Sequence, residues 1–160
     1  MSETIEILTI FIIHQIDSVT GPQYDSPYCS VLPDCPPSVE KKLTSNVNKA
    51  LVIDYSDSRL ISCGSIYQGV CTVRSLRNIS HVEQQIKEPV VANNATASTV
   101  AFIAPGPPNP PITQVMYVGV TYTGNGPYRS EVPAVCSRSL DSNSLFQVII
   151  IIIIISNISN

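Results

Sequence analysis

Short apolar, β-branched runs separated by turn residues dominate the middle of this chain. Residues 49–54 (KALVID) form one such run, residues 55–58 (YSDS) are a turn cluster, and residues 59–64 (RLISCG) begin a second run. Runs of this length and composition, bounded by Asp, Ser and Gly, are typical of strands. The pattern therefore predicts a hairpin.

A third run, residues 70–75 (VCTVRS), extends this hairpin into a meander. Its residues alternate, with Cys71, Val73 and Ser75 on one face and Val70, Thr72 and Arg74 on the other. Residues 76–94 are less regular, and the short segment 82–87 within them is compatible with a helix.

Strand-like pattern resumes further along the chain. We expect strands at residues 98–104, 115–122 and 132–140. Residues 105–111 (PGPPNPP) are poor in backbone donors and predict a loop, and residues 123–128 (TGNGPY) predict a turn. No long amphipathic helix is indicated, so the fold class is all-β, an antiparallel meander.

Both ends of the chain depart from this pattern. Residues 5–13 are apolar but follow Glu3 and Glu6 rather than Lys or Arg, and no small-residue cleavage site follows, so they match a signal peptide poorly. Residues 148–155 are one Val and seven Ile, far short of the ~20 residues that a membrane-spanning helix needs. Because composition changes abruptly after Gln147, we interpret residues 148–160 as an artefact of the gene model.

Charge and composition narrow the function classes. Nine basic and twelve acidic residues give a net charge of -3 without basic clusters, so no nucleic-acid partner is expected. Thirteen prolines argue against a helical bundle, and 44% hydrophobic residues argue against general disorder.

The five cysteines favour an oxidising compartment, because four of them form two close pairs, Cys29 with Cys35 and Cys63 with Cys71. Neither spacing suits zinc. Cys63 and Cys71 flank one tight turn, where opposed residues come within disulfide range, so a bridge is expected there. Two buried free thiols remain the alternative. Cys136 is the odd cysteine.

Candidate modification sites are the sequons at Asn78, Asn94 and Asn157, which agree with a secretory route. His14 and His81 have no nucleophile motif near them, so neither is expected to be catalytic. We predict no enzyme activity, no metal site and no cofactor.

Residues 46–76 (NVNKALVIDYSDSRLISCGSIYQGVCTVRSL), with residues 19–25 (VTGPQYD) and Cys29, resemble the N-terminal part of a plexin sema domain. The similarity extends over about residues 19–146. The hairpin 63–71 (CGSIYQGVC) is similar to the plexin form rather than to that of semaphorins, and an A-type plexin is preferred.

This resemblance implies a specific architecture. Sema domains are seven-bladed β-propellers with four-stranded antiparallel blades, and this chain would supply about two of them. It implies the pairs Cys29–Cys35 and Cys63–Cys71 and gives Cys136 no partner. The expected organisation is an unaligned segment 1–18, a partial sema domain 19–147 and the Ile-rich tail 148–160.

Two functions are therefore expected as alternatives. In the first, the chain is a truncated part of a plexin-like receptor on the extracellular face of the plasma membrane, whose complete form binds semaphorins and acts in axon guidance. No ligand-contact residue is carried over, and no transmembrane segment is expected in this chain. In the second, it is a free-standing secreted β-protein, held by disulfides, that binds another partner.

Overall fold

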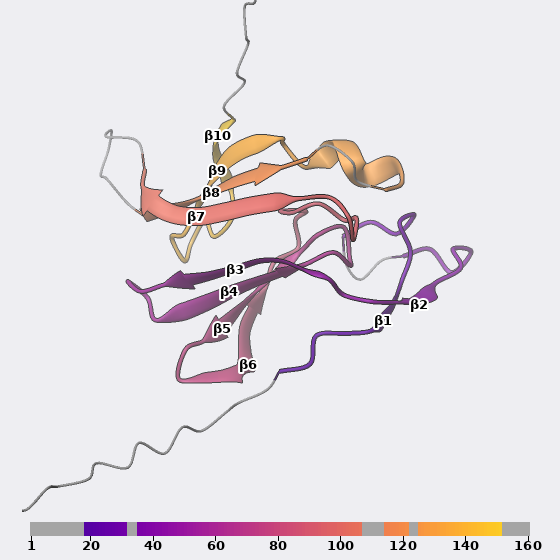
Figure 1. Ribbon diagram of the computed structural model, residues 1–160, viewed down its shortest axis with the longest axis horizontal. Helices are drawn as coiled ribbons and strands as arrows, with labels where there is room; N and C mark the ends of the chain where they lie inside the picture. Colours follow the sequence, from indigo (N-terminus) through magenta and orange to yellow (C-terminus); the bar gives the residue numbers. More distant parts are fainter. Residues whose placement is uncertain (1–17, 32–34, 107–113, 122–124, 152–160) are drawn as a thin grey trace, which may run out of the picture.

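Two four-stranded antiparallel sheets stack face to face in the computed structural model (Figure 1), which describes residues 18–31, 35–106, 114–121 and 125–151. The first sheet follows chain order and consists of β3 (Asn48–Asp54), β4 (Arg59–Gly64), β5 (Cys71–Ser75) and β6 (Asn78–Gln85). It is the meander that the alternating pattern predicted, extended by one strand.

The second sheet has the order β10-β9-β8-β7. Its strands are β7 (Thr99–Pro105), β8 (Gln114–Val120), β9 (Val135–Ser139) and β10 (Val148–Ile151). A 3₁₀ helix, η1 (Pro127–Glu131), precedes β9. A small separate hairpin-like sheet pairs β1 (Gln23–Asp25) with β2 (Lys42–Thr44). The all-β fold class, with blades of antiparallel strands, is confirmed.

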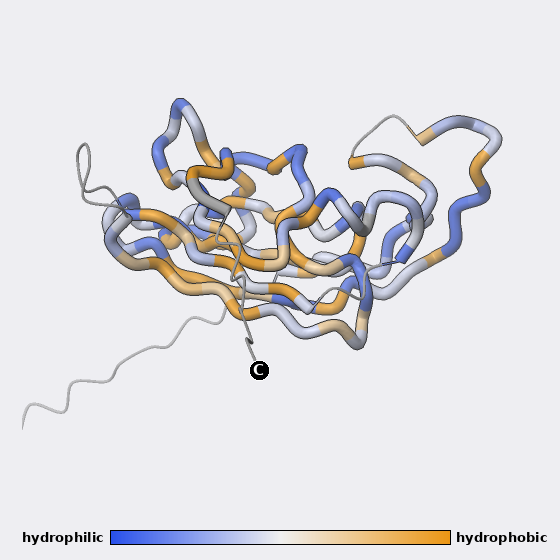
Figure 2. Tube along the Cα trace, turned by 90° about the horizontal axis from the view of Figure 1, so that it is seen from above, coloured by the Kyte–Doolittle hydropathy of each residue, from blue (hydrophilic) through white to orange (hydrophobic). Residues whose placement is uncertain are grey.

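The hydrophobic core lies between the two four-stranded sheets. Ile61 and Val73 come from the first sheet, Met116 and Val118 from the second, and Phe146 from the loop before β10; all are buried. Figure 2 shows hydrophobic segments running through the middle of the molecule and hydrophilic residues at several turns along its edge. Because each blade presents one apolar face to the other, neither sheet would be stable alone.

Three expectations about local structure need correction. Residues 82–87 are not helical: β6 runs through Gln85 and pairs with β5. Val82 and Ile86 are four apart, which is a helical spacing, but the free edge of β5 recruits this segment as a strand. The strands expected at 132–140 and 115–122 are shorter, at Val135–Ser139 and Gln114–Val120. The strands β1 and β2 were not predicted from the sequence.

The start of the Ile-rich tail takes part in the second sheet. β10 pairs antiparallel with β9, with Val148 opposite Arg138 and Ile151 opposite Cys136. The second sheet therefore extends four residues beyond Gln147, where the partial sema domain was expected to end. The origin of the tail in a gene-model artefact stays a hypothesis.

Candidate interaction sites

The turn between β4 and β5 is closed by a disulfide between Cys63 and Cys71 (Cα–Cα 4.0 Å), which are directly paired in the strand register. Gly64 N–H donates to the carbonyl of Val70 inside this loop. Gly69 has a φ of 80°, and a Cβ at this position would lie 1.8 Å from the carbonyl oxygen of Val91, so the turn requires glycine here.

A second disulfide, Cys29–Cys35, lies beside this turn. The side-chain amide of buried Gln68 donates to the carbonyls of Cys29 and Pro27 and accepts from Asn93. Gln68 has a φ of 65°, a conformation that most residues avoid. One turn residue therefore connects the Cys63–Cys71 loop to the Cys29–Cys35 loop.

Tyr67 occupies the same turn and contacts β1. Its backbone N–H donates to Asp25 Oδ2 at 2.8 Å, and its hydroxyl donates to the Gln23 side chain. Burial, together with the negative charge of Asp25, raises the pKa of Tyr67. The phenol therefore stays neutral at physiological pH and donates this hydrogen bond.

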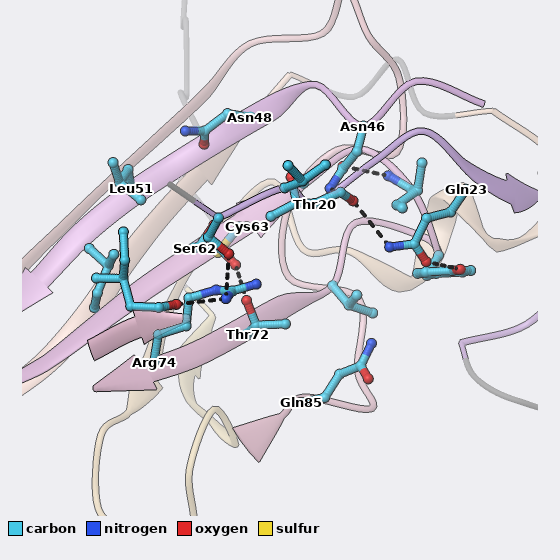
Figure 3. A pocket seen from close by; sticks show the side chains of 18 residues that line it. Thr20, Gln23, Asn46, Asn48, Leu51, Ser62, Cys63, Thr72, Arg74 and Gln85 are labelled. Carbon is cyan, nitrogen blue, oxygen red and sulfur yellow. Dashed lines mark hydrogen bonds between the residues drawn. The ribbon is translucent and has the colours of Figure 1, made fainter. Parts of the chain in front are cut away.

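A pocket of about 340 Å³ lies beside this turn, on the face of the first sheet that is turned away from the core (Figure 3). Residues 18–20 form one wall, and the strands β4 and β5 form its floor through Leu60, Ser62, Thr72 and Arg74. Asn46 donates to the Thr20 carbonyl at 3.2 Å and so fixes the wall to the sheet.

Arg74 is the one formally charged residue that lines this pocket, and it is 8% exposed. Its Nη1 donates to Ser18 Oγ and to the Ile79 carbonyl, both at 2.8 Å. Within the described residues, no carboxylate lies within ion-pair distance of Arg74.

The two other buried arginines do have carboxylate partners. Arg59 Nη2 lies 2.7 Å from Asp54 Oδ2 and 2.6 Å from Asp57, and it also donates to the carbonyl of Leu140, the residue directly after β9. Burial alone raises the pKa of Asp54, but hydrogen bonds from Ser56 and Arg59 and the charge of Arg59 lower the pKa below its ordinary value overall.

Arg138 connects the second sheet to the segment between β6 and β7. Its Nη1 lies 3.4 Å from Glu88 and donates to the Phe146 carbonyl, while Nη2 donates to the Pro89 carbonyl. A buried guanidinium whose donors reach carbonyls of two loops fixes those loops around it.

The outer faces of both sheets carry exposed apolar side chains. Leu51 is 60% exposed on β3, and Val100 and Phe102 are 65% and 53% exposed on β7. Phe102 stacks on Tyr117 of β8 with ring centroids 5.3 Å apart. Apolar residues gathered on a sheet face are typical of surfaces that another protein segment covers.

The sequence-predicted sites lie apart from the pocket, except that Cys63 lines it. Asn78 is exposed at the start of β6, where its Oδ1 accepts from Ser80 N–H. Asn94 is half-buried in the loop before β7, and its Oδ1 accepts from Thr96. His81 is exposed on β6. His14 and Asn157 lie outside the described residues.

Cys136 is a buried free thiol on β9, within the core. In the part of the chain that the structure describes, no group of three or more His, Cys, Asp or Glu side chains could hold a metal ion. Over the same residues, no helix is long and apolar enough to cross a membrane.

Sequence reasoning missed the three buried arginines, although the strand pattern contained a signal for two of them. Arg59 is in phase with Ile61 and Cys63, so it had to point into the core. Arg138 is in phase with Cys136 in the same way. Arg74 is out of phase with Val73, and the pattern alone predicts exposure for it; residues 18–20 cover it instead.

Several curated plexins have sequences similar to this chain. Plexin-A4 of Mus musculus is 30% identical over 142 residues, or 86% of this chain, and Plexin-A2 of Homo sapiens is 47% identical over 75 residues, or 45% of it. Plexin-B3 of Homo sapiens is 35% identical over 95 residues. By sequence, the chain matches a fragment of a plexin.

The solved extracellular region of plexin A4 has the same fold in the matching part. It superposes with a TM-score of 0.61 at 25% identity, covering 81% of this chain and 14% of that chain. The two sheets are therefore a partial propeller of the plexin type. No family model matches the chain.

The chain spans only a small part of these plexins, 7% of Plexin-A4, 4% of Plexin-A2 and 5% of Plexin-B3. Both A-type and B-type plexins are among the matches, so the A-type assignment stays a prediction.

Proposed function

We propose that this chain supplies two adjoining blades of the extracellular, semaphorin-binding propeller of a plexin-like receptor, which acts in semaphorin signalling and axon guidance. The observation that carries the proposal is the superposition on the plexin A4 extracellular region together with the sequence match over 86% of the chain. The two disulfides suit an extracellular location.

In this role the chain is a structural section of the propeller. This section is kept rigid by the disulfide-closed turn, the β1–β2 sheet and the two paired blades. The adjoining blades pack against the outer faces that carry Leu51 and Phe102. Semaphorin contacts belong to the complete propeller.

A chimera tests this proposal directly. Residues 19–147 of this chain replace the matching segment of the plexin A4 extracellular region, and binding of a semaphorin that recognises unaltered plexin A4 is measured on cells. We expect surface display and an affinity within about tenfold of the unaltered receptor. A chimera that is displayed normally but does not bind contradicts the proposal.

A control chimera carries Cys63→Ser and Cys71→Ser. Because the turn is then open, this chimera is expected to be retained in the cell. The free 160-residue chain is tested in parallel. The alternative of a self-sufficient secreted protein is favoured if the free chain is a soluble monomer that unfolds in one cooperative transition while the displayed chimera does not bind semaphorin.

A further inference from the structure

The pocket beside the Cys63–Cys71 turn contains a buried positive charge that has no counter-charge among the described residues. Arg74 is 8% exposed and lines the pocket, and none of the other residues lining it carries a formal charge. Burying a guanidinium is costly unless a negative group or a full set of acceptors surrounds it. Among the described residues, the positive charge of Arg74 therefore has no negative partner.

The other two buried arginines among the described residues pair with carboxylates in this same fold. Arg59 has Asp54 and Asp57 as partners, and Arg138 has Glu88. Within the described residues, the acceptors of Arg74 are only a hydroxyl, Ser18 Oγ, and a carbonyl, that of Ile79. The missing partner is a carboxylate.

The N–H donors of Arg74 that remain available lie along one edge of its guanidinium group. Both hydrogen bonds of Arg74 use Nη1, which leaves Nε and Nη2 free of partners among the described residues. These two nitrogens present parallel N–H groups along one side of the guanidinium plane. This edge matches the two oxygens of a carboxylate in a bidentate pair.

The surroundings of Arg74 favour a carboxylate on a polypeptide over a small free ion. Leu60 and Leu51 line the same pocket, and Leu51 is 60% exposed. A free ion would satisfy Arg74 and leave this apolar surface in water. A peptide segment satisfies Arg74 and buries the apolar surface at the same time.

We propose that the pocket between residues 18–20 and the outer face of β4 and β5 binds an acidic side chain, Asp or Glu, of a polypeptide segment packed against this sheet, with Arg74 as its bidentate partner. The inference stands on the pocket itself and does not require that the chain be part of a semaphorin receptor.

Peptide binding to the monomeric 160-residue chain tests the proposal. The probe is an N-acetylated, C-amidated pentapeptide with one central glutamate between valines, and the matched peptide has glutamine instead. NMR of the Arg74 Nε–H group reports contact directly. We expect its resonance to shift with saturation for the glutamate peptide, with at least about tenfold weaker binding for the glutamine peptide.

Three variants assign the effect to this residue. Arg74→Gln is expected to abolish the difference between the two peptides. Arg74→Lys retains the charge but not the planar edge and is expected to weaken glutamate binding by at least about tenfold. Arg77→Gln removes an exposed arginine three residues away and is expected to leave binding unchanged.

Two outcomes overturn the proposal. Equal affinity for the glutamate and glutamine peptides, or an Arg74 Nε–H resonance that does not move, shows that no carboxylate is bound. Acetate or inorganic phosphate that binds as tightly as the glutamate peptide shows that the occupant is a small anion rather than a polypeptide segment.

Discussion

Among the residues whose burial the structure describes, three arginine side chains are buried, and their surroundings determine what each does. Arg59 and Arg138 are ion-paired and donate to carbonyls of distant segments, so they hold the two sheets and their loops together. Arg74 faces away from the core, toward a pocket. The same residue type is structural at two positions and available for binding at the third.

Asp54→Asn is expected to reduce the stability of the chain at pH 7 by about 2 to 3 kcal/mol, because a buried charge-assisted hydrogen bond to Arg59 is lost. The pKa of Asp54 is lower in the folded chain than the unfolded value of about 3.9, so this stabilisation is present above that pH and is lost as pH falls through the folded pKa.

Urea denaturation of both proteins from pH 7 to pH 2 measures this effect. The difference in the free energy of unfolding between wild type and Asp54→Asn is expected to narrow below about pH 4. Asp57→Asn is the control, since Asp57 is exposed and its pair with Arg59 contributes at most about 1 kcal/mol. A difference in the free energy of unfolding that stays constant with pH would contradict stabilisation by the charged Asp54 carboxylate.

Gly69→Ala is expected to destabilise the chain by about 2 kcal/mol or more, because residue 69 has a positive φ and its Cβ would meet the Val91 carbonyl. Thermal denaturation monitored by circular dichroism measures the loss. Gly119→Ala is a fitting control, since the nearest atom to its Cβ is 4.0 Å away. Equal stability of the two variants would show that the turn adjusts freely.

Among the elements, the strands with alternating apolar residues could be predicted from the sequence. β3, β4 and β5 and the middle of β7 and β8 have such a pattern, because each has one face in the core. β6 escaped prediction because nearly all its residues are exposed, so it carries no burial signal. β1 and β2 have three residues each and lack a buried face, so only their pairing defines them.

Of the candidate sites, the Cys63–Cys71 bridge could be predicted from the sequence and the pocket beside it could not. The Cys63–Cys71 spacing across a turn is visible in the sequence because the bridge is local. The pocket is not, because it forms where residues 18–20 cross strands more than 40 positions later, and Arg74 is conspicuous only once its surroundings are known to lack a carboxylate.

Opening the disulfide of the β4–β5 turn is expected to lower stability by about 2.6 kcal/mol, from the unfolded-chain entropy of the nine-residue loop that it closes. The double variant Cys63→Ala and Cys71→Ala, compared with wild type by urea denaturation, measures it. A loss below about 0.5 kcal/mol would show that the hydrogen bonds of Gln68 and Gly64 hold the turn without the bridge.

At the scale of the whole molecule, the two sheets share one core and leave their outer faces with apolar side chains in water. A plexin propeller places further blades against such faces, and this chain covers 14% of the plexin A4 chain that it superposes on. The outer faces explain why a chain with a well-formed core also presents large hydrophobic surfaces.

Replacing Leu51 and Phe102 by Thr is expected to raise the monomeric proportion of the chain, because each removes exposed apolar area from a different outer face. Size-exclusion chromatography with light scattering measures it. Tyr55→Thr is the control, since Tyr55 is 81% exposed but lies in a turn. An equal gain from Tyr55→Thr would show that association does not depend on the sheet faces.

A non-reducing peptide map of the chain secreted from animal cells tests the central claim most directly. The account of an extracellular plexin-type double blade predicts Cys29 linked to Cys35, Cys63 linked to Cys71, Cys136 as a free thiol, and glycans on Asn78 and Asn94. Any other cysteine pairing, or a secreted chain with unmodified Asn78 and Asn94, would contradict it.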